Sequence, residues 1–205
     1  MFMLLLEGNL INLRDWALPD LPKFREWMQP EHEWHKYDGP YYPQATPEEI
    51  EQMVARRRQA ILNNSFPSPR RNLAIVDRET DMLIGMVSWY WQGEETNWLS
   101  VGICIYNPLY WGQGRGYEAL GLWCEYLLSA NPALVRLDLR TWSGNVRMMR
   151  LAEKLGYQQE ARFRKARIVN GKYYDGMGYG ILREEWQERY PKGFAAHLSK
   201  RKPMR

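Results

Sequence analysis

One stretch decides the fold of this chain: Trp111-Gly112-Gln113-Gly114-Arg115-Gly116-Tyr117-Glu118-Ala119-Leu120. It follows a β-rich run at 98–106 and leads into a segment whose apolar residues recur at helical spacing. Glycines let the backbone take positive φ and approach a ligand, and the first turn of a helix presents unpaired N–H groups. A strand, a glycine-rich turn and a helix in this order therefore predict a binding site for an anion such as a pyrophosphate.

Two other interpretations of the glycine-rich turn compete with this one. The fingerprint for nicotinamide dinucleotides places its third glycine three residues after the second, within an early βαβ unit. Here Gly116 follows Gly114 by two residues and several expected strands precede the turn, so we reject that interpretation. A turn with a purely structural role stays open if the glycines are considered alone.

Toward the N-terminus, periodicity predicts a strand at 9–14, a helix at 21–28, a helix beginning at Thr46, and strands at 73–76 and 83–91. The start at Thr46 has a specific reason. Thr46 and Glu49 have the spacing of a capping box, in which each side chain bonds the other residue's backbone N–H. Pro47 suits the first helical position.

Toward the C-terminus, the sequence predicts a strand at 134–141 and a helix from Asn145 to Leu155, with Gly156 as its C-terminal cap. Two final strands flank Asn170-Gly171, a pair typical of tight hairpins. The whole order is a meander of strands, then strand, helix, strand and helix, then a hairpin. It indicates one α/β domain built around a mixed sheet.

Four stretches of the sequence resemble a known family. Their occurrence in the family's order is more specific than any one of the matches. They are 102–106 with 111–120, 144–145 with 151–157, 170–175 with 182–186, and 9–14. They are similar to the GNAT N-acetyltransferase superfamily and, more narrowly, to its RimJ/RimL branch, whose members acetylate protein N-termini or small amines. The resemblance implies a GNAT domain over 1–187, with a mixed central sheet, flanking helices and a splayed strand pair for the CoA arm. Residues 188–205 are then expected to form a basic C-terminal tail and not a separate domain.

The resemblance also implies where acetyl-CoA, the expected co-substrate, would bind. The pantetheine arm would lie along 98–106 and pair with backbone groups of Ile103 and Ile105. The pyrophosphate would sit on the turn and helix start, at Gly112, Gln113, Gly114, Arg115, Gly116 and Tyr117. Asn145 falls where the family has an asparagine that holds the pantetheine or aligns the acceptor. Asn is also a favoured helix N-cap, and both roles stay open.

The sequence departs from the family at the positions of its acid–base groups. Many relatives carry a tyrosine, used as general acid, where this chain has Ala152, and the branch often has serine where this chain has Met148. A general base would have to come from elsewhere, and the candidates are Glu94, Glu95 and Asp138, each of which also fits an ordinary surface charge. We name Asn145 and Glu95 as catalytic candidates and expect positioning of the two substrates to supply much of the rate.

An aromatic loop at 34–42 is the candidate for the acceptor site. Runs of His, Asp, Pro and Tyr between helices are unusual as filler, although packing is the alternative explanation. The candidate substrate-binding residues are Trp34, His35, Asp38 and Tyr41.

Composition limits the remaining classes of function. The 205 residues carry 28 basic and 24 acidic side chains, a net charge of +4 that is too small for a nucleic-acid-binding signature. The sequence has no apolar run long enough to cross a membrane, and its three histidines show no metal-ligand spacing. Two cysteines make no disulfide framework, so we expect a cytoplasmic protein, monomeric or homodimeric, without a metal.

The predicted function is transfer of an acetyl group from acetyl-CoA to a primary amine by direct attack in a ternary complex. Two alternatives stay open. One is a non-catalytic module that binds acyl-CoA, and the other is an acyltransferase that uses another donor, such as succinyl-CoA.

Overall fold

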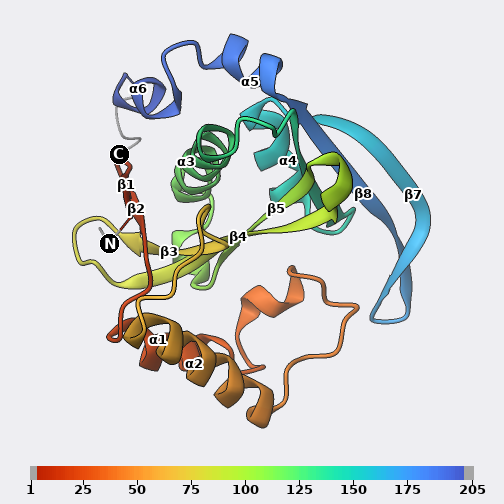
Figure 1. The fold of residues 1–205 in the computed structure, drawn as a ribbon. Helices are drawn as coiled ribbons and strands as arrows, with labels where there is room; N and C mark the ends of the chain where they lie inside the picture. Colours follow the sequence, from red (N-terminus) through yellow and green to blue (C-terminus); the bar gives the residue numbers. More distant parts are fainter. Residues whose placement is uncertain (1–3, 201–205) are drawn as a thin grey trace.

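A mixed sheet of eight strands forms the middle of the molecule, in the computed structural model that describes residues 4–200 (Figure 1). Its strand order is β1-β2-β3-β4-β5-β6-β8-β7. The strands are β1 Leu5–Glu7, β2 Ile11–Arg14, β3 Asn72–Asp77, β4 Leu83–Gly93, β5 Trp98–Ile105, β6 Arg136–Trp142, β7 Gln158–Val169 and β8 Lys172–Leu182. Neighbouring strands are antiparallel except β5 and β6, which run parallel. The predicted mixed sheet is confirmed.

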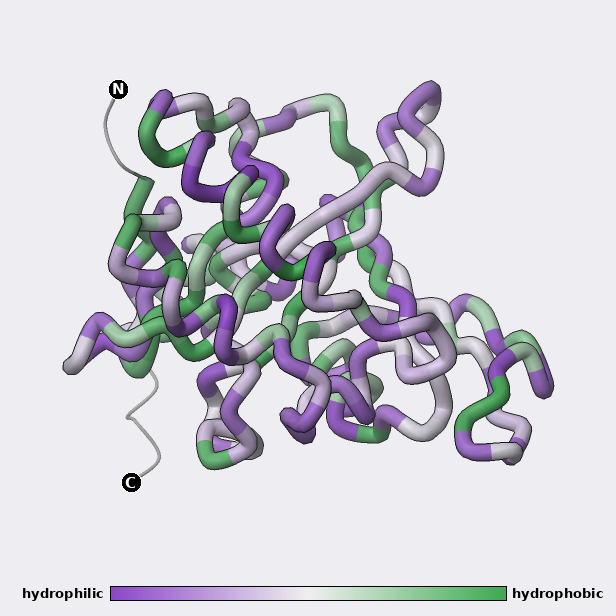
Figure 2. Tube along the Cα trace, turned by 90° about the horizontal axis from the view of Figure 1, so that it is seen from below, coloured by the Kyte–Doolittle hydropathy of each residue, from purple (hydrophilic) through white to green (hydrophobic). Residues whose placement is uncertain are grey.

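Helices cover both faces of this sheet (Figure 1). They are α1 Asp20–Trp27, α2 Pro47–Leu62, α3 Arg115–Ala130, α4 Val146–Leu155, α5 Arg183–Arg189 and α6 Phe194–Ser199, with short 3-10 turns η1 Glu33–Lys36, η2 Glu94–Thr96 and η3 Pro108–Tyr110. The larger core packs α3 to α6 against one face, and a smaller core packs α1, α2 and η1 against the other. Figure 2 shows hydrophobic residues gathered mostly along the central segments, with hydrophilic ones dominating the outer loops. No helix within residues 4–200 is long and apolar enough to cross a membrane.

The short sequence motifs at Thr46, Gly156 and Asn170 adopt the local structures predicted from them. Glu49 N donates to Thr46 Oγ1 at 3.2 Å, and Thr46 N donates to Glu49 Oε2 at 2.8 Å, which completes the capping box of α2. Gly156 ends α4 with φ of 102°. Asn170 and Gly171 have φ of 50° and 74°, as a tight hairpin turn between β7 and β8 requires.

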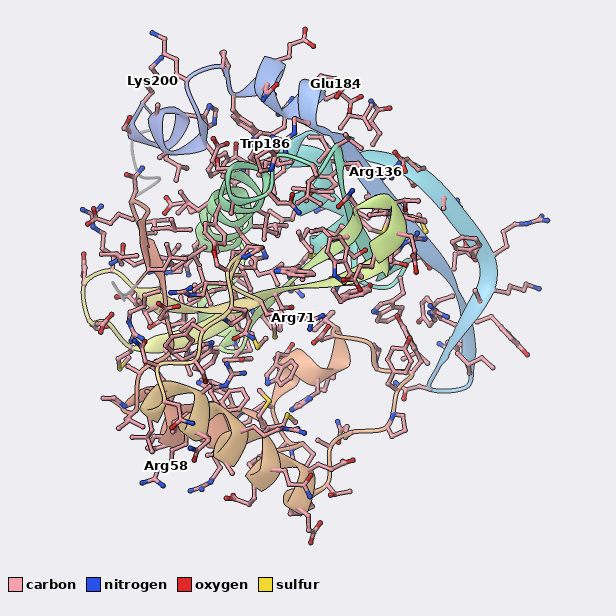
Figure 3. All side chains as sticks on the ribbon, in the orientation of Figure 1. Arg58, Arg71, Arg136, Glu184, Trp186 and Lys200 are labelled. Carbon is pink, nitrogen blue, oxygen red and sulfur yellow. The ribbon has the colours of Figure 1, made fainter. Side chains whose placement is uncertain are left out.

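The two ends of the chain differ from the prediction. The strand expected from residue 9 begins at Ile11, and Leu5–Glu7 form an additional strand, β1, paired with β2. At the other end, Phe194 on α6 is fully buried against Gly121, where an added Cβ would lie 2.0 Å from its ring. Trp186 reaches from α5 to α3 and donates to Glu125 (Figure 3). Residues 188–199 of the expected tail are therefore packed on the domain, while 201–205 lie outside the described residues.

Candidate active site

The sheet opens between its two parallel strands. Within the described chain, β5 pairs with β6 only at Leu99–Leu137 and Ser100–Asp138, and beyond these pairs the strands part. Tyr106 N donates to Ile84 O at 2.9 Å. Because backbone hydrogen bonding alternates along an antiparallel strand, the even-numbered residues of β5 bond to β4. The N–H and C=O groups of Ile103 and Ile105 therefore face the opening, where Ile105 O accepts from Trp111 Nε1 at 2.8 Å. The predicted splayed strand pair is present.

The glycine-rich turn lies directly after this opening. Gly112 and Gly114 have φ of 75° and 90°, and α3 starts at Arg115 without a side-chain cap. The first helical bond runs from Glu118 N to Gly114 O, so the N–H groups before Glu118 have no partner within α3. A Cβ added at Gly112 would meet nothing within 4 Å. The turn thus presents a row of helix-terminal amides to open space, which suits an anion.

Two side chains of the turn are directed elsewhere than the sequence predicted. Arg115 Nη1 donates to Gln113 Oε1 at 2.6 Å, and its Nη2 lies 3.3 Å from Asp77 Oδ2 at the end of β3. The guanidinium also covers the ring of Tyr110 at 4.6 Å. Neither Arg115 nor Gln113 lines the cavity described below. A partly buried carboxylate outside the site attracts the arginine, so these two residues offer the site only backbone groups.

This arrangement makes Arg115 a stabilising residue. We expect Arg115→Gln to lower the free energy of unfolding by about 1 to 2 kcal/mol, because it removes a charge-assisted contact with Asp77. Urea denaturation measures the change. Arg58, exposed on α2 (Figure 3), supplies the control Arg58→Gln, expected within ~0.5 kcal/mol of the parent. Equal stability of the two variants would show that the Asp77 contact contributes nothing.

A cavity of about 1500 Å³ extends from the turn and the opening to the aromatic loop. One wall carries three cations of α4, namely Arg147, Arg150 and Lys154. The Arg147 guanidinium lies 4.9 Å from the Trp111 ring, and Lys154 Nζ lies 5.1 Å from the Tyr117 ring. The site residues predicted from the sequence do not include these cations, although their spacing of three and four residues places them on one helix face.

Asn145 joins α4 to the aromatic loop. Its Oδ1 accepts from Met148 N at 3.1 Å, so it is the N-cap of α4. Its Nδ2 donates to Tyr37 O at 3.1 Å, and Trp142 Nε1 donates to the same oxygen at 2.9 Å. Asn145 also lines the cavity, and its predicted contact with the pantetheine or acceptor stays a prediction.

Two members of the aromatic loop act mainly as its scaffold. Trp34 is 8% exposed, donates through Nε1 to Trp27 O at 2.7 Å, and stacks on His35 with ring centroids 3.7 Å apart. His35 Nε2 lies 2.9 Å from Gln29 O, and burial holds the pKa of His35 below its ordinary value of 6.5. These contacts fix the loop against α1 while both side chains border the cavity.

Asp38 and Tyr41 form the loop's face toward the cavity. Of the described residues lining the cavity, Asp38 alone carries a carboxylate. The Asp38 side chain is exposed toward the cavity, and desolvation by the protein around it raises its pKa above the ordinary carboxylate value. No ion pair of Asp38 occurs within residues 4–200. Tyr41 lies beside it with the Arg167 guanidinium 4.6 Å from its ring.

The other acid–base candidates lie in different surroundings. Glu94 and Glu95 are exposed on η2 and do not line the cavity. Asp138 is 2% exposed and accepts from Arg136 Nε at 2.8 Å, so its interpretation as a surface charge is wrong. The charges of Arg136 and Arg140 made its burial possible. Cys104 borders the cavity, and burial raises its pKa well above the ordinary value, which keeps the thiol neutral.

Residues 148 and 152, where relatives often carry a hydroxyl group, lie in different surroundings. Met148 lines the cavity, whereas Ala152 is fully buried in the larger core. Neither side chain carries a hydroxyl that could protonate a leaving thiolate.

Comparison with known proteins identifies acetyltransferase relatives. Residues 11–158 match the family model described as an acetyltransferase (GNAT) domain. The SPbeta prophage-derived uncharacterized N-acetyltransferase YokL of Bacillus subtilis (strain 168) is 27% identical over 105 residues, which are 51% of this chain and 58% of YokL. The chain thus spans little more than half of that relative's length.

Solved structures share the fold over nearly the whole chain. A GNAT-family acetyltransferase from Bacillus anthracis superimposes with a TM-score of 0.69 at 19% identity, covering 88% of this chain and 99% of that one. RimL, described as a ribosomal L7/L12 alpha-N-protein acetyltransferase, gives a TM-score of 0.65 at 14% identity, covering 89% and 96%. At these identities the likeness concerns the fold.

Proposed function

Because this chain belongs to the GNAT acetyltransferase family, whose members transfer an acyl group from acyl-CoA to an amine, we propose that it moves an acetyl group from acetyl-CoA to a primary amine. The amine is a protein N-terminus or a small molecule. One observation carries the proposal. The opening between β5 and β6, the glycine-rich turn and the carboxylate of Asp38 all border one cavity.

The donor fits the half of the cavity bounded by β5 and α4. The pantetheine amides would pair with Ile103 and Ile105, as a further strand does at a sheet opening. The pyrophosphate would accept from the amides at the start of α3, and Arg147, Arg150 and Lys154 would add positive charge beside it. If the donor occupies this half, the other half of the cavity, bounded by the aromatic loop, β6 and β7, is available for the acceptor.

Asp38 fits the role of the group that receives the acceptor amine. An ammonium must lose a proton before its nitrogen attacks the thioester carbon, and a carboxylate with a raised pKa is a better proton acceptor than an ordinary one. The C–N bond then forms as the C–S bond breaks. The nitrogen loses a second proton, the departing thiolate gains one, and one proton is released overall. Water bound in the cavity is the candidate carrier to the sulfur, since Met148 and Ala152 cannot donate.

The proposal is tested by thiol release from acyl-CoA donors with a panel of amines. We expect acetyl-CoA to be consumed in an amine-dependent way, and succinyl-CoA more slowly. Binding of acetyl-CoA without turnover of any amine would instead support the non-catalytic alternative. Faster turnover of succinyl-CoA would reassign the donor.

The donor's position has its own test in amide hydrogen exchange. Saturating acetyl-CoA should slow exchange at Ile103 and Ile105 at least tenfold, because their backbone groups gain a bound partner that suppresses opening. The amide of Ile75, in the centre of β3 and away from the cavity, serves as the internal control. Slower exchange at Ile75 alone, with none at β5, would move the donor to another site.

A further inference from the structure

The cations of the cavity form two separate groups. Arg147, Arg150 and Lys154 lie on α4 beside the glycine-rich turn, where the proposed function assigns them to the donor. Arg140 and Arg167 lie on β6 and β7, on the side of the aromatic loop. In Figure 1 the segment between α1 and α2 extends toward the β7–β8 hairpin. Residues of that segment and of the hairpin, among them Tyr41 and Arg167, line the same cavity. The second group is therefore placed for the acceptor.

Arg140 and Arg167 each have N–H groups that no protein acceptor within residues 4–200 occupies. In the part of the chain that the structure describes, Nε of Arg140 and Nε of Arg167 are buried and have no hydrogen-bond partner. The contact of Arg140 with Asp138 Oδ2 is long, at 3.5 Å, and Asp138 is already held by Arg136. Arg167 donates from Nη1 to Ala166 O at 3.1 Å. A guanidinium is always charged and carries five donors. The unpaired Nε atoms are buried, so the Nη groups are the donors left to receive an anionic acceptor.

Tyr41 connects the second group to the carboxylate of Asp38. Its ring lies 4.6 Å from the Arg167 guanidinium. Burial does most to raise the pKa of Tyr41, Arg167 opposes the rise, and Asp38 adds to it. Both charges are thus close enough to act on one phenol. A positive and a negative group therefore both act on this aromatic ring at one wall of the cavity.

We propose that the acceptor is an amine that also carries a carboxylate or a phosphate, with its amino group at Asp38 and its anionic group at Arg167 and Arg140. This inference rests on the proposed function and narrows its acceptor to one chemical class. Asp38 alone would select any ammonium, whereas two arginines with unused donors reject an acceptor that leaves them unpaired. A carboxylate and a phosphate accept from a guanidinium in the same geometry, so the structure gives the shared chemistry.

The experiment compares amines that differ only in the anionic group: ethanolamine with O-phosphoethanolamine, and 5-aminopentanol with 5-aminopentanoate. We expect kcat/KM to be at least tenfold higher for the anionic member of one pair, and the pair that responds identifies phosphate or carboxylate. Arg167→Gln and Arg140→Gln should lower that ratio about tenfold to a hundredfold, as for loss of a charge-assisted contact. Arg164→Gln, also on β7 but exposed and outside the cavity lining, should keep the ratio of the parent.

Calorimetry on the CoA-saturated protein, with the same amines, gives a result independent of turnover. Tighter binding of the anionic amines, weakened by Arg167→Gln and kept by Arg164→Gln, supports the inference even if no amine is acetylated. In that case the proposed function alone fails. Equal kcat/KM and equal affinity within both pairs would overturn the inference while acetyl transfer itself stands. It is also overturned if Arg167→Gln changes the choice between succinyl-CoA and acetyl-CoA and leaves the amine preference unaltered.

Discussion

Replacing Asp38 by asparagine should lower kcat for acetyl transfer by about 10² to 10⁴, the range for loss of a general base. Asp38 is the lone carboxylate among the described residues that line the cavity, and its raised pKa makes it a better proton acceptor than a carboxylate in water. Asparagine keeps the shape of the side chain but cannot take a proton. Steady-state thiol release with whichever amine is active measures the effect.

The pH dependence of the rate gives a second readout of the same residue. The base works in its ionised form, so kcat/KM of the parent should rise with pH through the raised pKa of Asp38, above the ordinary carboxylate range near 3.8. This limb should disappear in Asp38→Asn. A raised folded-state pKa also means that the ionised side chain costs free energy in the folded protein above that pKa. The variant should therefore be no less stable than the parent at neutral pH, which separates lost catalysis from unfolding.

Two other carboxylates serve as control and as competitor. Glu33→Gln alters an exposed residue that directly precedes the aromatic loop and does not line the cavity, and kcat should change less than about threefold. Glu95→Gln tests the catalytic candidate predicted from the sequence. A hundredfold loss at Glu95, with Asp38→Asn near the parent, would identify Glu95 as the base and contradict the role of Asp38.

The parts of the fold that rest on local chemistry were predictable from the sequence. The capping box at Thr46 and Glu49, the Asn170-Gly171 turn and the glycine cap at 156 depend on residues a few positions apart, whose geometry is nearly independent of the rest of the chain. The glycine-rich turn belongs to the same class. Its positive φ values follow from the residue type, because glycine alone adopts them without strain.

Other features depend on contacts between distant segments, which periodicity does not record. Arg115 stands within the predicted anion-binding turn, yet its side chain contacts Asp77, which lies 38 positions earlier in the sequence. Phe194 is buried because Gly121 leaves space for its ring, and nothing near Phe194 in the sequence reveals that space. Asp138 follows the pattern of an exposed strand position and is buried because Arg136 and Arg140 pair with it. For Arg115 and Phe194 complementarity between distant segments decides the outcome, whereas the charges that pair with Asp138 stand two residues away on its own strand.

Gly114→Val should raise the dissociation constant of acetyl-CoA at least about a hundredfold. Gly114 has φ of 90°, a conformation that costs an ordinary residue about 1 to 2 kcal/mol and a β-branched one more. The turn would relax toward negative φ and rotate the amides at the start of α3 away from the ligand. Losing two charge-assisted bonds, each worth about 1.5 kcal/mol or more, gives a factor of about a hundred. Calorimetry with acetyl-CoA measures it.

Gly171→Val is the matched control for this loss. Gly171 has φ of 74° and open space around an added Cβ, so valine there carries similar backbone strain at the tip of the β7–β8 hairpin. Both variants should lose comparable stability in thermal unfolding, but only Gly114→Val should lose affinity for acetyl-CoA, because only that turn forms the start of α3. Parental affinity in Gly114→Val would place the pyrophosphate elsewhere. Equal loss of affinity in both variants would mean that general destabilisation, and not the orientation of the α3 amides, determines binding.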